Sequence, residues 1–171
     1  DWFINKIYSN IKSNNIEFRI IGGHVPKKLL NKKNQNIRFL GWVENIHLEL
    51  DSCDVLIAPM QSGSGLQTKI LDYLQHSKII LCTKRALNGF NKWPNFKNVY
   101  VTDNYQDYIK ILKKINTKKT KYKMESEKVI IKERMQYLNE NFSEKNIIEL
   151  WRTLLEIDLH LKIYLFVLEL H

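Results

Sequence analysis

The residues best suited to chemistry lie in one short stretch of the sequence. Gly63, Ser64 and Gly65 precede an amphipathic stretch that contains Lys69 and Asp72. Glycines at such a junction let the backbone approach a bulky ligand, and the first N–H groups of the following helix remain free to bind an anion. At about 100° per residue, Lys69 and Asp72 fall on the face of Gly65, opposite the apolar face. This ammonium and carboxylate could bind a phosphate and a sugar diol. A solvated Lys–Asp pair is the alternative, and spacing alone does not decide between them.

Short apolar runs that alternate with helical stretches predict the scaffold that positions these residues. We expect strands at residues 17–21, 37–40, 55–58, 79–83 and 99–102, and helices at 1–14, 44–52, 66–75 and 105–115, with a short turn or helix at 26–30. Apolar runs without strict alternation, each followed by a helix, are typical of a parallel sheet with helices on both faces. Ligands of such sheets bind beyond the carboxyl ends of the strands. Those ends carry Gly22, Gly23, Gly41, Pro59 and Thr83.

The pattern changes to helix alone beyond residue 123. Two amphipathic stretches follow, at residues 124–139 and 143–156, and Ser143 is a suitable N-cap for the second. We therefore predict two parts: a Rossmann-like domain at residues 1–123 and a C-terminal helical extension at 124–171.

The tail at residues 157–170 is apolar but contains His160, Lys162 and Glu169. It is too short and too charged to span a membrane. Two interpretations stay open: the tail packs against a further domain, which we favour, or it lies on a membrane interface.

The composition is that of a globular protein, with 44% apolar residues and a net charge of +9 from 27 basic and 18 acidic side chains among 171 residues. This surplus suits an anionic partner, or is a solvated lysine-rich surface. The lysine run at residues 110–123 has no interleaved aromatic platform, so a nucleic-acid binder rests on charge alone. Cys53 and Cys82 form no metal-type pair and are interpreted as core thiols. We see no metal-ligand cluster and expect no metal.

The stretch at residues 63–72, GSGLQTKILD, resembles the G-x-G-x-x-x-K-x-L-E signature of retaining glycosyltransferases with the GT-B fold, of the group 1 or family 4 type. Neighbouring segments resemble the same family in the same order. They are the strand that ends in glycines at 20–23, the V-x-F-x-G-x-V segment at 37–43, the A-D-V-x-x-x-P segment at 53–59, and the P-V-V-x-T and E-G-L segments at 79–90. The resemblance implies the α/β, Rossmann-like, donor-binding C-terminal half of such an enzyme.

The resemblance also implies a substrate, a nucleotide-diphosphate-sugar linked to uridine or guanosine, and no cofactor. In relatives, the residues that correspond to Gly65, Leu66 and Lys69 hold the diphosphate, and Lys69 would be the catalytic cation that stabilises its departure. Asp72 would hold the ribose hydroxyls. The remaining donor-binding positions would lie in the loops, with Gly41 and Val43 beside the base, Gly22 and Gly23 on the cleft floor, and Gly63 and Ser64 before the helix. We interpret Trp42, between Gly41 and Val43, as a packing residue rather than a base-stacking one.

The function implied is transfer of a hexose, with retention, to a glycan or lipid-linked acceptor in polysaccharide biosynthesis. We expect a cytoplasmic protein, with peripheral contact at the inner face of the membrane as a further expectation. The acceptor would bind an N-terminal half that this sequence does not contain, so the chain alone would be inactive. The alternative is a non-catalytic binding remnant of the same fold.

Three departures from the family pattern bear on this function. Ser64 stands where many relatives carry an acidic residue, and Asp72 stands where most carry Glu. The chain also begins after the position of the family's first strand, so we expect an N-terminally truncated domain. That strand is central in the order 3-2-1-4-5-6. Its absence predicts unpaired strand edges inside the sheet.

Overall fold

The computed structural model describes residues 2–11, 16–23, 36–63, 65–90, 92–117 and 124–146. Four expected features lie outside these residues: the turn at 26–30, Ser64, most of the helix at 143–156 and the tail at 157–170. Asn146 donates its backbone N–H to the Ser143 hydroxyl at 3.3 Å. This bond is the one that an N-cap at Ser143 would make.

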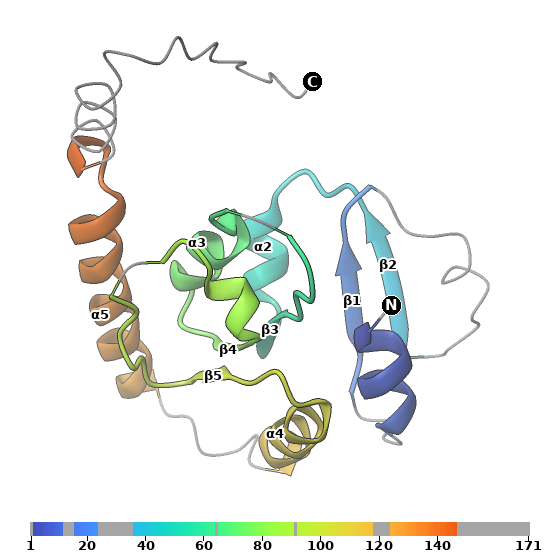
Figure 1. Ribbon diagram of the computed structural model, residues 1–171. Helices are drawn as coiled ribbons and strands as arrows, with labels where there is room; N and C mark the ends of the chain where they lie inside the picture. Colours follow the sequence, from blue (N-terminus) through green and yellow to red (C-terminus); the bar gives the residue numbers. More distant parts are fainter. Residues whose placement is uncertain are drawn as a thin grey trace, which may run out of the picture.

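In the described part of the chain, five parallel strands form two separate sheets (Figure 1). The first pairs β1 (Phe18–Ile21) with β2 (Ile37–Gly41), and Phe18 lies opposite Ile37. The second has the order β3-β4-β5, formed by Val55–Ala58, Ile79–Cys82 and Val99–Val101. The parallel α/β architecture predicted from the sequence is confirmed. The break between β1 and β3 agrees with the unpaired edges expected where a central strand would lie.

Helical segments follow the strands as the sequence pattern predicts. They are α2 (Ile46–Asp51), α3 (Thr68–Leu74), η3 (Lys84–Leu87), α4 (Tyr105–Thr117) and α5 (Met124–Phe142). The Asn45 side chain caps α2 by accepting the N–H groups of His47 and Leu48. The single helix expected at 1–14 is instead a π-helical turn, η1 (Phe3–Ile7), followed by a 3₁₀ turn, η2 (Tyr8–Asn10).

The core consists of two apolar clusters, one on each face of the three-stranded sheet. Ile80 and Cys82 of β4 belong to the first cluster, together with Ile70 and Leu74 of α3 and Tyr137 of α5. Leu81, which points to the other face, belongs to the second cluster, with Tyr108 and Leu112 of α4 and Phe18 of β1. Helices therefore cover both faces of this sheet, as a parallel sheet requires.

The two cysteines are free thiols in different environments. Cys82 is fully buried, as expected, and burial raises its pKa to about 12. Cys53 is only half-buried, and burial raises its pKa to a smaller extent. The interpretation as a core thiol is thus confirmed for Cys82, whereas Cys53 lines a cavity.

Candidate functional site

The glycine loop before α3 is open to solvent. Gly63 and Gly65 have positive φ angles of 117° and 76°, and both residues are exposed. A Cβ atom built on Gly65 would meet nothing within 4 Å. The loop thus adopts the backbone that glycine permits, with open space beside it.

The helix begins later than the sequence suggested, and this places Lys69 in its first turn. The sequence predicted a start at Leu66, but α3 begins at Thr68, after Gln67. Gln67 gives no side-chain cap to the helix; its amide donates instead to the Gly65 carbonyl at 3.4 Å. The N–H groups of the first turn therefore receive no side-chain acceptor from Gln67.

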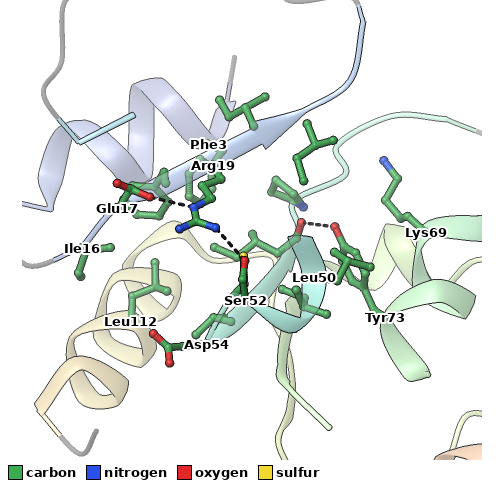
Figure 2. Close-up of a pocket in the computed structure, with 18 of the residues that line it drawn as sticks. Phe3, Ile16, Glu17, Arg19, Leu50, Ser52, Asp54, Lys69, Tyr73 and Leu112 are labelled. Atoms are coloured by element: carbon green, nitrogen blue, oxygen red, sulfur yellow. Dashed lines mark hydrogen bonds and ion pairs between the residues drawn. The ribbon is translucent and has the colours of Figure 1, made fainter. Parts of the chain in front are cut away.

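Lys69 and Asp72 lie on the same side of α3, as the helical periodicity predicted. Both line a cavity of about 840 Å³, together with Pro59 at the end of β3 and Ile21 at the end of β1. The Lys69 ammonium lies 3.5 Å from the Met60 sulfur, a weak acceptor, and makes no ion pair within the described part of the chain. Figure 2 shows Lys69 and Tyr73 projecting from α3 beside the cavity.

Three apolar or aromatic residues anchor α3 to the sheet. Ile70 and Leu74 are fully buried, and the Tyr73 hydroxyl donates to the Ile57 carbonyl at 3.3 Å. Burial raises the pKa of Tyr73 to about 12, so its hydroxyl remains a donor at neutral pH. Leu66, the first residue of the helix expected at 66–75, precedes the helix instead and is 37% exposed.

Gly89 packs closely against the backbone of Leu66, next to the glycine loop, and the sequence analysis missed this contact. A Cβ atom on Gly89 would lie 3.0 Å from the Leu66 Cα and 3.1 Å from its backbone nitrogen. Gly89 also has a φ of 88°, which L side chains rarely adopt. The segment at 88–90 was matched to the family pattern in sequence, but no periodicity could reveal that it touches the loop at Leu66.

The tips of β1 and β2 carry the residues expected on the cleft floor and beside the base. The Gly22 N–H donates to the Gly41 carbonyl at 2.8 Å and joins the two tips. The Trp42 side chain is 89% exposed, which contradicts its interpretation as a packing residue. Its indole lies over Gly23, where an added Cβ atom would meet the Trp42 Nε1 at 2.8 Å. Val43, also predicted beside the base, is half-buried.

Two further cations follow the carboxyl end of β4, in η3. Lys84 and Arg85 line a hollow of about 340 Å³ together with Met60, Gln61, Asn88 and Asp103. The buried Thr83 hydroxyl donates to the Met60 carbonyl at 2.7 Å and ties the ends of β3 and β4 together. The position of Arg85 after a strand was visible in sequence, whereas Lys84 received no role.

The described residues contain no group of three or more His, Cys, Asp or Glu side chains arranged to hold a metal ion. Among the helices that the structure describes, none has the length and apolar character needed to cross a bilayer.

A family model described as glycosyl transferases group 1 matches residues 1–115, a span that includes every predicted site residue. A search of curated proteins finds no match to this sequence.

Proposed function

Since the chain belongs to the group 1 glycosyl transferases, we propose that its donor site is the cavity at the start of α3 and that it takes a nucleotide-diphosphate-sugar. Membership of the family makes glycosyl transfer the chemistry of the chain. One observation carries the rest of the proposal. Lys69, whose ammonium makes no ion pair within the described residues, and Asp72 line the same cavity, and the helix that carries both follows an open glycine loop and has no side-chain cap from Gln67.

Each element of this cavity has a partner in the donor. The diphosphate bears negative charge, which Lys69 and the first N–H groups of α3 would stabilise. The ribose presents two neighbouring hydroxyls, and the Asp72 carboxylate can accept hydrogen bonds from both. Asp72 is half-buried, so these bonds would form in a partly water-excluded place. Lys84 and Arg85 would add positive charge on the side of β4.

The reaction would be a front-side displacement with retention. The bond between the anomeric carbon and the diphosphate oxygen breaks, the acceptor oxygen bonds to the anomeric carbon on the same face, and the acceptor proton passes to the departing diphosphate. Lys69 would act as the catalytic cation, because negative charge grows on the leaving diphosphate in the transition state. The acceptor would be a glycan or a lipid-linked sugar bound by a second, N-terminal half of a two-domain enzyme that works in polysaccharide biosynthesis. The chain alone would then be inactive.

We expect this enzyme in the cytoplasm, with a lipid-linked acceptor bringing it to the inner face of the membrane. The sugar of the donor would be a hexose and the base uracil or guanine.

The proposal is tested by calorimetric titration of the chain with uridine and guanosine diphosphates. Lys69→Ala should weaken the binding of one of them by about 1.5–3 kcal/mol, the range for a hydrogen bond to a charged group. The matched control is Lys132→Ala on the exposed face of α5, which removes the same charge away from the cavity. Equal dissociation constants for Lys69→Ala and the unchanged chain would contradict the donor site.

A non-catalytic binding remnant is the second candidate, and the break in the sheet between β1 and β3 favours it. This candidate predicts that neither diphosphate binds at millimolar concentration although the chain is folded by circular dichroism. Measurable binding that depends on Lys69 would exclude it.

A further inference from the structure

A second hollow lies next to the proposed donor cavity, on the side of β4. Two consecutive residues connect these spaces, because Pro59 lines the cavity and Met60 lines the hollow. The Met60 sulfur lies 3.5 Å from the Lys69 ammonium, and the Met60 carbonyl accepts a hydrogen bond from the Thr83 hydroxyl at 2.7 Å. The hollow, of about 340 Å³, therefore lies beside Lys69, toward the residues that follow β4.

The order of the groups along the site matches the order of the parts of the donor. This step rests on the proposed function, in which Asp72 holds the ribose and Lys69 holds the diphosphate. Both residues line the cavity, and neither lines the hollow. In a nucleotide-diphosphate-sugar, the diphosphate stands between the ribose and the transferred sugar. A diphosphate at Lys69 whose ribose lies toward Asp72 thus directs its sugar toward Met60 and the hollow.

The side chains that line the hollow carry a net positive charge. Lys84 and Arg85 are exposed, and neither makes an ion pair with another residue that the structure describes. Asp103 also lines the hollow, and one of its carboxylate oxygens already accepts the Lys84 backbone N–H at 2.9 Å. The segment from β3 to α3, at residues 59–67, contains no charged side chain. Two cations and one carboxylate make the hollow suited to an anionic group.

We propose that the hexose of the donor is a hexuronic acid, whose carboxylate binds Lys84 and Arg85 in this hollow. The planar guanidinium of an arginine can donate two parallel hydrogen bonds to a carboxylate. Gln61 and Asn88 also line the hollow, and their amides can donate to and accept from the sugar hydroxyls. A neutral hexose offers hydroxyls alone, so it leaves the two cations without an anionic partner.

The size of the hollow agrees with a single sugar unit. Its volume of about 340 Å³ is at the lower end of the range for ligand pockets, whereas the neighbouring cavity has about 840 Å³. The larger space suits the nucleoside and the smaller one suits the sugar, with Lys69 at their junction.

Calorimetric titration of the chain with matched pairs of donors tests the proposal. The pairs are uridine diphosphate-glucuronic acid with uridine diphosphate-glucose, and guanosine diphosphate-mannuronic acid with guanosine diphosphate-mannose. Within each pair the base is the same and the sugars differ only in the carboxylate. With the base that the chain binds, the acidic donor should bind at least about tenfold more tightly, as expected for a charge-assisted hydrogen bond. Equal dissociation constants within both pairs, or tighter binding of the neutral donors, would overturn the proposal.

Substitutions at Arg85 assign this preference to the hollow. Arg85→Gln should reduce the preference to less than about threefold, Arg85→Lys should keep most of it, and Arg85→Glu should reverse it. Lys132→Gln on the exposed face of α5 is the matched control and should keep the full preference. Thermal unfolding of each variant checks that it is folded. An Arg85→Glu variant that is folded and still prefers the acidic donor would overturn the proposal.

Titration with the bare diphosphates separates a failure of this inference from a failure of the donor site. Arg85→Gln should weaken the binding of the acidic donor at least about fivefold more than that of the diphosphate alone. Equal losses would mean that Arg85 holds the diphosphate, which overturns the hexuronic acid and leaves the donor site in place. If no nucleotide binds at millimolar concentration, the donor site is wrong and the hexuronic acid with it.

Discussion

The two sheets contain strands of similar apolar sequence, but the side chains of these strands are buried to different extents. Strand β4 (IILC) has a neighbour on each side and a helical layer on each face, and all four of its residues are buried. Within the described residues, strand β1 (FRII) pairs with one neighbour, and of its four residues only Phe18 is buried, whereas Arg19 is exposed. The difference shows that an apolar run makes a buried parallel strand only where both of its edges and both of its faces are occupied.

The test with the largest expected effect makes the same substitution, Leu to Ala, in each sheet. Leu81→Ala removes a fully buried side chain of β4 and should lower the free energy of unfolding by about 3–4 kcal/mol. Leu40→Ala in β2, where the leucine is only half-buried, should cost about half as much. Urea denaturation of both variants measures the difference, and equal losses would contradict the unequal packing of the two sheets.

A buried guanidinium strengthens the three-stranded side. Arg134 of α5 is fully buried and donates to the carbonyls of His76, Lys78 and Lys97, at 3.0 Å for Lys78 and 3.4 Å for Lys97. Burial lowers its pKa to about 10, so it remains charged at neutral pH. Arg134→Met would leave these carbonyls without their donor and should cost about 2–3 kcal/mol in urea denaturation.

Lys132→Met on the exposed face of the same helix is the control for Arg134→Met. It should change the free energy of unfolding by less than about 0.5 kcal/mol. A similar loss of unfolding free energy in both variants would mean that the hydrogen bonds of Arg134 do not stabilise the three-stranded sheet and its helices.

The next test compares substitutions of two glycines with left-handed backbones, one in each region. Gly89→Ala combines a φ of 88° with a Cβ atom 3.0 Å from the Leu66 Cα, and should cost about 2 kcal/mol of stability. It should also weaken nucleotide binding, because the glycine loop must shift. Gly41→Ala, at a φ of 66° with nothing within 4 Å, carries only the backbone strain and should cost about 1 kcal/mol. Thermal unfolding separates the two, and equal costs would argue against the contact with Leu66.

The smallest expected effect is a pH dependence at the end of α2. The Asp51 carboxylate accepts a hydrogen bond from the His76 Nδ1 at 2.6 Å, and this bond holds the pKa of Asp51 below its usual range. When folding lowers the pKa of an Asp carboxyl, the charged carboxylate stabilises the folded protein at pH values above the ordinary Asp pKa of about 3.9. That stabilisation is lost as the pH falls through the lowered pKa.

Asp51→Asn should therefore be less stable than the unchanged chain at pH 5. The difference should be under about 1 kcal/mol, because the carboxylate is largely exposed, and it should vanish by pH 2. Urea midpoints between pH 2 and 5 measure it, and a difference that persists to pH 2 would exclude the charge as its cause.

The strands were the most predictable part of the molecule, because a buried strand needs only a short apolar run between turn residues. The expected run at 55–58 is β3 itself, and the others differ from their strands by one residue at an end. The shared side of Lys69 and Asp72 was also predictable, since helical periodicity alone fixes it. Their roles toward a donor stay a prediction.

Features that depend on distant contacts could not be predicted. Nothing near Arg134 in the sequence signals that its guanidinium is buried, because its three acceptor carbonyls belong to segments 37 or more residues away. The exposure of Trp42 was missed for a similar reason: a tryptophan in an apolar segment is usually buried, but here it lies at the tip of a strand with one neighbour.

The second apolar cluster joins Phe18 of β1, Leu81 of β4 and Tyr108 of α4. Because this cluster joins both sheets through α4, we expect the two sheets to unfold together although their ladders are interrupted. Substitutions at the buried face of α4, which supplies no predicted donor-binding residue, should then lower the melting temperature of both sheets.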